Sequence, residues 1–221
     1  MALEVERKYI FETQEEVDRL IAERIHVSAI VQWYLDKGER LSSSQRLRWS
    51  LFPDSTKPRA QWSERWVYSS KTSLDDDFFR RQENETAVFP ENPPGFLQPF
   101  LEDPDTLFRF PFVSKLRFLL REEPEVVLDI FWMPFVSSRS SRGEEGTLVP
   151  MMEIELKRNR DETVFPEVLR QMGLQRAVRD VTGEARFLNH QLALACFPQI
   201  STKPSFSWLS RELASQLLKY Q

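Results

Sequence analysis

The chain has 221 residues, a net charge of −4 and 41% hydrophobic residues, the balance of a soluble globular protein with a sizeable core. The acidic average argues against a general binder of nucleic acid or of an anionic membrane, because such proteins normally carry a basic excess. A single cysteine, Cys196, excludes an internal disulfide and a thiolate zinc cluster, and two widely separated histidines do not suggest a histidine-rich metal site.

The amino-terminal residues contain no apolar signal region, and no apolar run approaches the ~20 residues that span a bilayer. The lone cysteine also suits a reducing compartment. We therefore expect a cytoplasmic protein with no membrane partner and no nucleic-acid partner.

The amino-terminal half predicts mostly strands. Residues 13–25 are the exception, because apolar side chains recur there at helical spacing after Thr13 and Glu16, which form a capping-box pattern. Proline and polar residues predict a loop at 53–59. Alternating, β-branched and aromatic residues predict strands at 2–10, 29–35, 45–52, 62–71 and 78–89.

The carboxy-terminal half begins with a connection at residues 90–111, which hold six of the 14 prolines and leave room for a short helix near 96–101. About eight strands joined by turns favour an antiparallel sheet in an α+β protein. We expect one domain over residues 1–197 and a helical tail over 198–221. The remaining elements are strands at 113–121, 125–133 and 148–158, a polar loop at 137–146, helices at 164–172, 183–197 and 208–220, and a linker at 198–204.

Charged stripes are the most informative pattern. In the first strand, alternation places Glu4, Glu6 and Lys8 on one face and Val5 and Arg7 on the other. One such stripe is typical of the solvent face of an edge strand. Comparable stripes recur on four more strands, and two further strands add single charges: Arg46 and Arg48; Arg81, Glu83 and Glu85; Lys115 and Arg117; Glu153, Glu155 and Lys157; Lys71; and Asp129.

A solvated face would use serine, threonine and amides as freely as charges, whereas these positions repeat like-charged pairs. Like charges on one face repel unless an opposite charge lies between or across from them. The set therefore favours a closed barrel with the charges inside and the apolar faces outside, beneath helices. A solvated face remains the alternative for any single strand.

These residue types predict a phosphate site. Arginine forks match phosphate oxygens and lysines add point charge, so converging cations would demand a polyanion. The carboxylates would repel that polyanion unless a divalent metal stood between them, and oxygen ligands select Mg²⁺ or Mn²⁺. Such a metal would polarise a phosphoryl group and orient or activate water. With only six glycines and no glycine-rich loop, backbone cradling of phosphate is not expected.

The same residues resemble a known family. Glu4-x-Glu6-x-Lys8 is similar to the ExExK signature of the CYTH superfamily, the triphosphate tunnel metalloenzymes, and the resemblance covers about residues 2–195. The later motifs follow in order: Gln32-x-Tyr34-Leu35, Arg46-Leu47-Arg48, Lys71, Arg81-x-Glu83-x-Glu85, Lys115-x-Arg117, Asp129, Glu153-Ile154-Glu155-Leu156 and residues 181–193.

The resemblance implies an eight-stranded antiparallel barrel whose interior, the tunnel, binds a triphosphate and divalent cations. It implies that a carboxy-terminal helix plugs one tunnel mouth, either at 184–196 or at 206–219. For the helix at 206–219, a position on the outer surface of the barrel is an equal alternative. It implies a catalytic set of Glu4, Glu6 and Lys8. It also implies phosphate-binding residues Lys8, Arg46, Arg48, Lys71, Arg81, Lys115 and Arg117, and metal ligands Glu4, Glu6, Glu83, Glu85, Asp129, Glu153 and Glu155.

The expected activity is metal-dependent hydrolysis of inorganic triphosphate to pyrophosphate and phosphate, by a monomer or homodimer. The alternatives are a nucleoside or thiamine triphosphatase, an adenylyl cyclase, and a non-catalytic polyphosphate-binding module. An organic triphosphate would need aromatic or polar groups at the tunnel mouth. The tryptophans are candidates for this role, although we expect most of them to face outward against helices: Trp33, Trp49, Trp62, Trp66 and Trp132.

Overall fold

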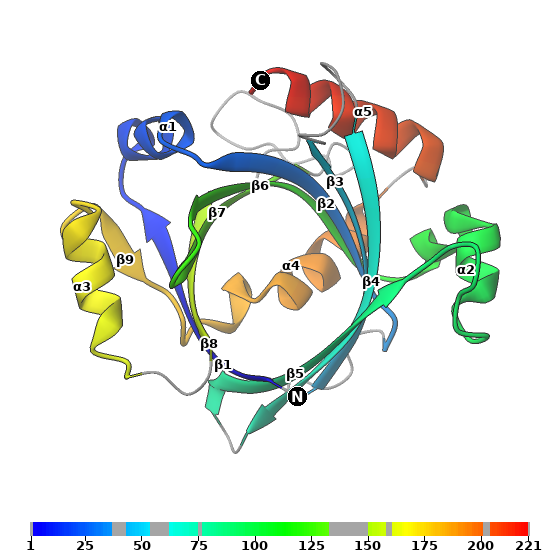
Figure 1. Cartoon of the computed structure of the whole chain (residues 1–221), viewed down its shortest axis with the longest axis horizontal. Coiled ribbons are helices and arrows are strands. Elements are labelled where there is room, and N and C mark those ends of the chain that lie inside the picture. Colours follow the sequence, from blue (N-terminus) through cyan, green and yellow to red (C-terminus); the bar gives the residue numbers. More distant parts are fainter. Residues whose placement is uncertain are drawn as a thin grey trace.

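The computed structural model describes residues 2–36, 43–53, 62–74, 77–132, 150–157, 161–200 and 204–220. Within them, one nine-stranded sheet has the strand order β5-β4-β3-β2-β6-β7-β8-β1-β9 (Figure 1). The strands are β1 (Ala2–Phe11), β2 (His26–Tyr34), β3 (Ser43–Pro53), β4 (Trp62–Leu74), β5 (Asp77–Val88), β6 (Phe112–Arg121), β7 (Glu125–Phe131), β8 (Met151–Lys157) and β9 (Val178–Asp180).

The sheet curves around a central space. Every pairing between neighbouring strands is antiparallel, as predicted. In addition to β8, strand β1 pairs with β5 over four positions, from Ala2 opposite Glu83 to Val5 opposite Arg80. Strands β1 to β8 are therefore arranged as a ring in Figure 1, and the inner faces of all eight look toward the same space. The predicted α+β class with an antiparallel sheet and flanking helices is confirmed.

Helices lie on both sides of this sheet. Figure 1 shows α1 (Gln14–Ala22), α3 (Val164–Gln171) and α5 (Phe206–Leu218) outside the ring and α4 (Asn189–Cys196) within it. Short helices occupy the connections: α2 (Gln98–Glu102), η1 (Pro104–Arg109), η2 (Ala185–Phe187) and η3 (Phe197–Gln199). Among the described residues, no helix is long and apolar enough to cross a membrane.

The outer face of the sheet carries the main hydrophobic core. Alternation along the strands points Val5, Leu47 and Ile154 outward, where all three are buried. They belong to one large cluster that includes Leu209 and Leu213 of α5. Burying these side chains supplies the main free energy of folding.

The tryptophans contribute to the same outer core. Phe206, at the start of α5, has its ring centroid 6.1 Å from that of Trp33, 5.2 Å from that of Trp49 and 5.5 Å from that of Trp66. Trp132 stacks on Trp208 with a centroid distance of 6.3 Å. The expectation that most tryptophans face outward against helices is thus confirmed, and α5 is a helix of the outer surface.

Helix α4 covers one end of the inner face, where the lining changes from charged to apolar. Ala193 of α4 packs with Tyr34, Val113, Phe131 and Met151, which project inward from four strands. The plug expected at residues 184–196 is therefore supported by the packing of α4. The alternative segment, 206–219, lies outside the ring.

Several local predictions need correction. Thr13 is the residue before α1, but its side chain makes no capping hydrogen bond. The continuous helix predicted at 183–197 is divided into η2 and α4, and the short edge strand β9 was not predicted. Most of the predicted loop at 53–59 and the whole of that at 137–146 lie outside the described residues.

Candidate active site

A charged cavity of about 170 Å³ lies inside the ring of strands, against the first residues of α4. Because inward-facing side chains alternate along each strand, the sequence stripes meet here. The lining residues that the structure describes include seven carboxylates and six cations. They are Glu4, Glu6, Glu83, Glu85, Glu125, Glu153 and Glu155; Lys8, Arg46, Arg48, Lys71, Arg117 and Lys157; and Gln32, Tyr34, Ser44, Leu188, Asn189 and His190.

The carboxylates concentrate on three adjacent strands. Glu6 of β1 lies opposite Glu155 of β8, which in turn lies opposite Glu125 of β7. Like charges placed directly across from one another on neighbouring strands destabilise a sheet. This acidic row (Glu6, Glu125 and Glu155) therefore favours the binding of a cation, and Lys157 lies near it with Nζ 3.5 Å from Glu155 and 3.6 Å from Glu125.

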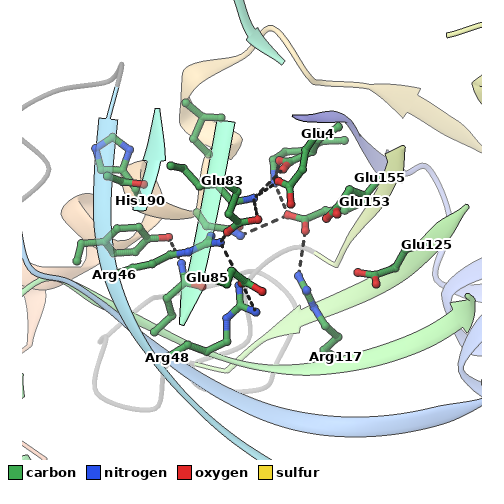
Figure 2. Close-up of a pocket in the computed structure, with 18 of the residues that line it drawn as sticks. Glu4, Arg46, Arg48, Glu83, Glu85, Arg117, Glu125, Glu153, Glu155 and His190 are labelled. Carbon is green, nitrogen blue, oxygen red and sulfur yellow. Dashed lines mark hydrogen bonds and ion pairs between the residues drawn. The ribbon is translucent and has the colours of Figure 1, made fainter. Parts of the chain in front are cut away.

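Three arginines face the acidic strands from the other side of the cavity. Figure 2 shows Arg46, Arg48 and Arg117 projecting toward the space that Glu153 and Glu155 approach from the opposite wall. Arg46 and Arg48 are two residues apart on β3, and Arg117 comes from β6. The three guanidinium groups thus face the acidic row across the cavity, while Glu83 and Glu85 lie beside Arg46 and Arg48.

Ion pairs join charged side chains of nearby strands within the cavity. The Lys71 ammonium donates to Glu4 at 2.8 Å and lies 3.3 Å from Glu83. Arg46 donates from Nε to Ser69 Oγ at 2.6 Å and pairs with Glu83 through its Nη2. Removing a charge from water costs free energy, and each ion pair offsets part of that cost. An unpaired buried charge would carry the whole cost.

Lys8 is enclosed by carboxylates on its own and the neighbouring strand. Its ammonium lies 3.0 Å from Glu6 and also pairs with Glu153. The side chain is only 3% exposed, so these two carboxylates compensate its charge where water has little access. Lys8 therefore joins the acidic strands β1 and β8 at the level of the cavity.

Arg48 is the least compensated of the described cavity arginines. Its nearest carboxylate, Glu85, is 3.7 Å from Nη1, and its buried Nε has no hydrogen-bond partner. Burial, together with the charges of Arg46 and Arg117, lowers the pKa of the Arg48 guanidinium. An anion that accepted hydrogen bonds from Arg48 would relieve this deficit.

Asp129 lies behind the cavity wall. It is 0% exposed, and it accepts hydrogen bonds of 2.7 Å from both Nε and Nη2 of Arg117 and a further one from Lys115. Arg117 also donates to Glu153 at 2.9 Å. In this arrangement Asp129 and Lys115 orient Arg117, and neither belongs to the described lining of the cavity.

Glu4 and Glu83 are buried carboxyls whose pKa values are displaced in opposite directions. Burial and a hydrogen bond to Glu83 raise the pKa of Glu4 to about 8, against the opposing charge of Lys71. For Glu83, burial is outweighed by the hydrogen bond from Glu4 and the charges of Arg46 and Lys71, so its pKa falls to about 2. The two carboxyls therefore influence each other's protonation.

The start of α4 forms the floor of the cavity. Asn189 donates from Nδ2 to Glu153 Oε1 at 3.3 Å, and its buried Oδ1 has no hydrogen-bond partner. The His190 ring lies 5.6 Å from the Tyr34 ring, centroid to centroid. Both residues come from the segment after β9, far in sequence from the strands they face.

Most of the site residues predicted from the stripes line one cavity. Lys115 and Asp129 lie behind it, and the Arg81 side chain lies outside what the structure describes, although its backbone pairs with Glu4. Glu125 and Asn189 were not predicted as site residues, since neither repeats a charge along its own strand or helix. Lys157, Gln32, Tyr34 and His190 also line the cavity, and the alternation of β8 and β2 could have identified the first three.

The donor chemistry of the acidic row suits a hard divalent cation, because every donor is a carboxylate oxygen. Within the part of the chain that the structure describes, no group of three or more His, Cys, Asp or Glu residues is already gathered in a metal-binding arrangement. The row therefore fits a metal by the type of its ligands.

Comparisons with known proteins add similarities at the level of overall shape. No family model and no curated protein matches this chain. Among solved structures, the PH1012 protein from Pyrococcus horikoshii OT3 is 16% identical with a TM-score of 0.49, over 87% of this chain and 99% of that one. The inorganic triphosphatase NE1496 is 19% identical with a TM-score of 0.40, over 86% and 94%.

A third similar structure is HpAC1 from Hippeastrum, named as an adenylyl cyclase with a dominant triphosphatase activity. It is 15% identical with a TM-score of 0.40, over 79% of this chain and 89% of that one. At these scores the likenesses carry no argument about what this chain does. It is the ordered motifs, and the charged cavity that they line, that make this chain resemble the CYTH superfamily.

Proposed function

We propose that this protein is a triphosphatase of the CYTH type that uses a divalent metal, Mg²⁺ or Mn²⁺, and cleaves inorganic triphosphate to pyrophosphate and phosphate. The observation that carries the proposal is the charged cavity, with Arg46, Arg48 and Arg117 facing the acidic row across one enclosed space. A cavity of this kind matches a bound polyanion on one side and a cation on the other. We further propose that the enzyme works in the cytoplasm as a monomer or homodimer.

Phosphate binding would begin at Arg48, whose hydrogen-bonding capacity is the least used. Arg46 and Arg117 can then exchange part of their pairing with Glu83 and Glu153 for phosphate oxygens, because a guanidinium group binds phosphate in the same bidentate manner. Lys8 and Lys71 supply further positive charge from the acidic side of the cavity.

The acidic row and Glu4 are the residues that would hold the metal, with Glu153 beside them. A divalent ion there would neutralise phosphate oxygens and polarise the phosphoryl group under attack. The donor set fits such an ion by its chemistry, since it offers oxygen ligands from three neighbouring strands.

The hydrolytic step itself needs an oriented water and a place for its proton. The water oxygen bonds to a terminal phosphorus, the bridging P–O bond breaks, and pyrophosphate leaves while the water proton passes to a neighbouring base. Without a metal, burial and Glu83 raise the pKa of Glu4 to about 8. Glu4 would lose its proton on binding a divalent cation, and the neighbouring carboxylates would be the groups able to accept the proton of the attacking water.

The lining favours a small inorganic substrate. Within the described lining, Tyr34 and His190 are the ring-bearing side chains, and Trp33, Trp49 and Trp66 pack outward around Phe206. A base or thiazolium ring would therefore find few stacking partners here. Helix α4 also covers one end of the inner face, which limits how far a chain of phosphates can extend.

A phosphate-release panel tests the proposal. The purified protein is assayed with inorganic triphosphate, ATP and thiamine triphosphate, each with Mg²⁺, with Mn²⁺ and with EDTA. We expect metal-dependent release of one phosphate per inorganic triphosphate and slower turnover of the organic substrates. Arg170→Ala, at an exposed arginine of α3, is the control that should retain the wild-type rate.

Other outcomes of the panel identify the alternatives. Faster turnover of ATP or thiamine triphosphate would assign an organic substrate, and formation of cyclic AMP from ATP would assign a cyclase. Tight binding of triphosphate without turnover of any compound would establish a binding module and overturn the enzymatic proposal.

A further inference from the structure

A group of hydrogen bonds outside the cavity converges on Lys8. After β9, the chain leaves the edge of β1 but stays attached to the backbone of one residue. Val181 donates its amide to the Lys8 carbonyl at 2.9 Å, and the Lys8 amide donates to Thr182 Oγ1 at 3.0 Å. Both backbone groups of Lys8 on this side are thus bound by consecutive residues of one segment. We call Asp180, Val181 and Thr182 the Lys8 clamp.

Val181 and Thr182 of the clamp are buried, and the exposed Asp180 fixes the orientation of Thr182. Thr182 is 6% exposed, its amide donates to Asp180 Oδ1 at 2.9 Å, and its hydroxyl also donates to that oxygen. The other Asp180 oxygen accepts from Arg7 Nη1 at 3.1 Å, and Arg7 donates to Glu162 at 2.9 Å through Nη2. Charged groups on the outer surface therefore hold the Thr182 hydroxyl in the orientation that receives the Lys8 amide.

The same segment returns to Lys8 from inside the cavity. Seven residues after Thr182, the Asn189 amide donates to Glu153 Oε1, the oxygen that also pairs with the Lys8 ammonium. The segment from Thr182 to Asn189 is thereby attached to Lys8 at both ends, through its backbone outside and through its charge partner inside. Movement of either anchor would displace the Lys8 ammonium and the floor formed by α4 together.

From this geometry we infer that Thr182 is a positioning residue for triphosphate binding: its hydroxyl fixes Lys8 and the start of α4 relative to the cavity. Thr182 does not line the cavity and acts only through these two neighbours. The inference rests on the proposed function for its kinetic consequence, whereas its structural consequence, protection of the Lys8 amide, is independent of any activity.

The test compares Thr182→Val, which keeps the shape but removes the hydroxyl, with Thr182→Ser, which keeps the hydroxyl. For Thr182→Val we expect the KM for triphosphate to rise about tenfold with kcat changed less than about threefold, the scale of one lost buried hydrogen bond. Hydrogen exchange at the Lys8 amide should accelerate in the same variant. Thr182→Ser should restore both values toward those of the wild type.

Thr13→Val is the matched control, because Thr13 is exposed and its side chain makes no capping hydrogen bond. It should alter neither KM nor exchange at Lys8. If Thr182→Val does not fold, Arg7→Gln replaces it, since this change releases Asp180 from outside the cavity and should cause the same changes on a smaller scale.

The outcomes separate the two proposals. A wild-type protein that turns over no triphosphate overturns the proposed function, and accelerated Lys8 exchange in Thr182→Val then still supports the clamp. Unchanged exchange and unchanged KM in folded Thr182→Val, with an active wild type, overturn the clamp and leave the proposed function intact.

Discussion

The inner and outer faces of the same strands follow opposite physical rules. On β3, Leu47 and Trp49 face outward and are completely buried in the hydrophobic core, while Arg46 and Arg48 face inward with their charges. The outer face gains free energy by removing apolar surface from water. The inner face removes charges from water, which costs free energy that ion pairs recover only in part. One face therefore stabilises the fold, and the other is organised for a ligand.

The inner face itself contains both residues that support the fold and residues that are available to a ligand. Asp129 is fully enclosed and accepts hydrogen bonds from Lys115 and Arg117, whereas Arg48 retains an unpartnered buried Nε. Asp129 therefore supports the fold, and Arg48 is suited to binding a ligand. Substitutions on the two faces, and at different depths of the inner face, should therefore show which residues determine the free energy of unfolding and which determine the affinity for triphosphate.

The largest expected effect is on stability, at the base of the charged wall. Asp129→Ala would leave Lys115 and Arg117 without their shared carboxylate, and breaking a buried pair in this way costs about 3–5 kcal/mol of unfolding free energy. Urea denaturation measures it. Leu213→Ala, on the outer face, should cost about 2–5 kcal/mol through a cavity in the core while leaving the KM of the folded fraction unchanged.

A loss of stability in Asp129→Ala no greater than that of an exposed substitution would contradict this assignment. It would mean that Lys115 and Arg117 find other partners, such as Glu153, and that Asp129 is free to serve as a metal ligand. Glu15→Gln, at an exposed position of α1, provides the reference with no expected change in the urea midpoint.

The next effect is on binding, with little loss of stability. Arg48→Ala should weaken triphosphate binding by about 1.5–3 kcal/mol, the range for hydrogen bonds to charged groups. Because Arg48 is buried and poorly compensated, its removal should leave the free energy of unfolding unchanged or raise it. Calorimetric titration with triphosphate and urea denaturation measure the two quantities. Unchanged affinity in Arg48→Ala would remove this residue from the phosphate site.

The fold was predictable from the sequence to the extent that alternation and turns determine strands. The stripes on β1, β3, β5 and β8 placed their charges on one face, and the structure confirms that these faces look toward one space for the residues it describes. The like-charged pairs were the decisive signal, since only an enclosed face demands compensating charges. The resemblance left the plugging segment open between 184–196 and 206–219, and the structure places α4 at one end of the inner face and α5 outside the ring.

The parts that sequence could not predict depend on register between distant strands. Glu125 gains its role only because β7 pairs with β8 so that Glu125 lies opposite Glu155. Asp129 appeared equivalent to the cavity carboxylates, but its neighbours Lys115 and Arg117 occupy both of its oxygens. Strand β9 has three residues, too few for a periodic pattern, and its place is fixed by β1.

The last expected effect is the pH dependence of stability that the inner face adds. In the folded protein the pKa of Glu4 is raised to about 8, so between its ordinary value of 4.5 and about 8 the native state binds more protons than the unfolded state. The free energy of unfolding should therefore fall as the pH rises through this window, by at most about 1.4 kcal/mol per pH unit for one proton. Glu83 has the opposite sign, since its pKa is lowered to about 2, and its contribution is lost as the pH falls from about 4.5 toward 2. Urea titrations in EDTA from pH 5 to pH 9 should show the decline in the wild type and in Glu15→Gln, an exposed change on α1, but not in Glu4→Gln. A decline that persists in Glu4→Gln would assign the proton uptake to another carboxyl of the cavity, such as Glu155, whose pKa burial also raises.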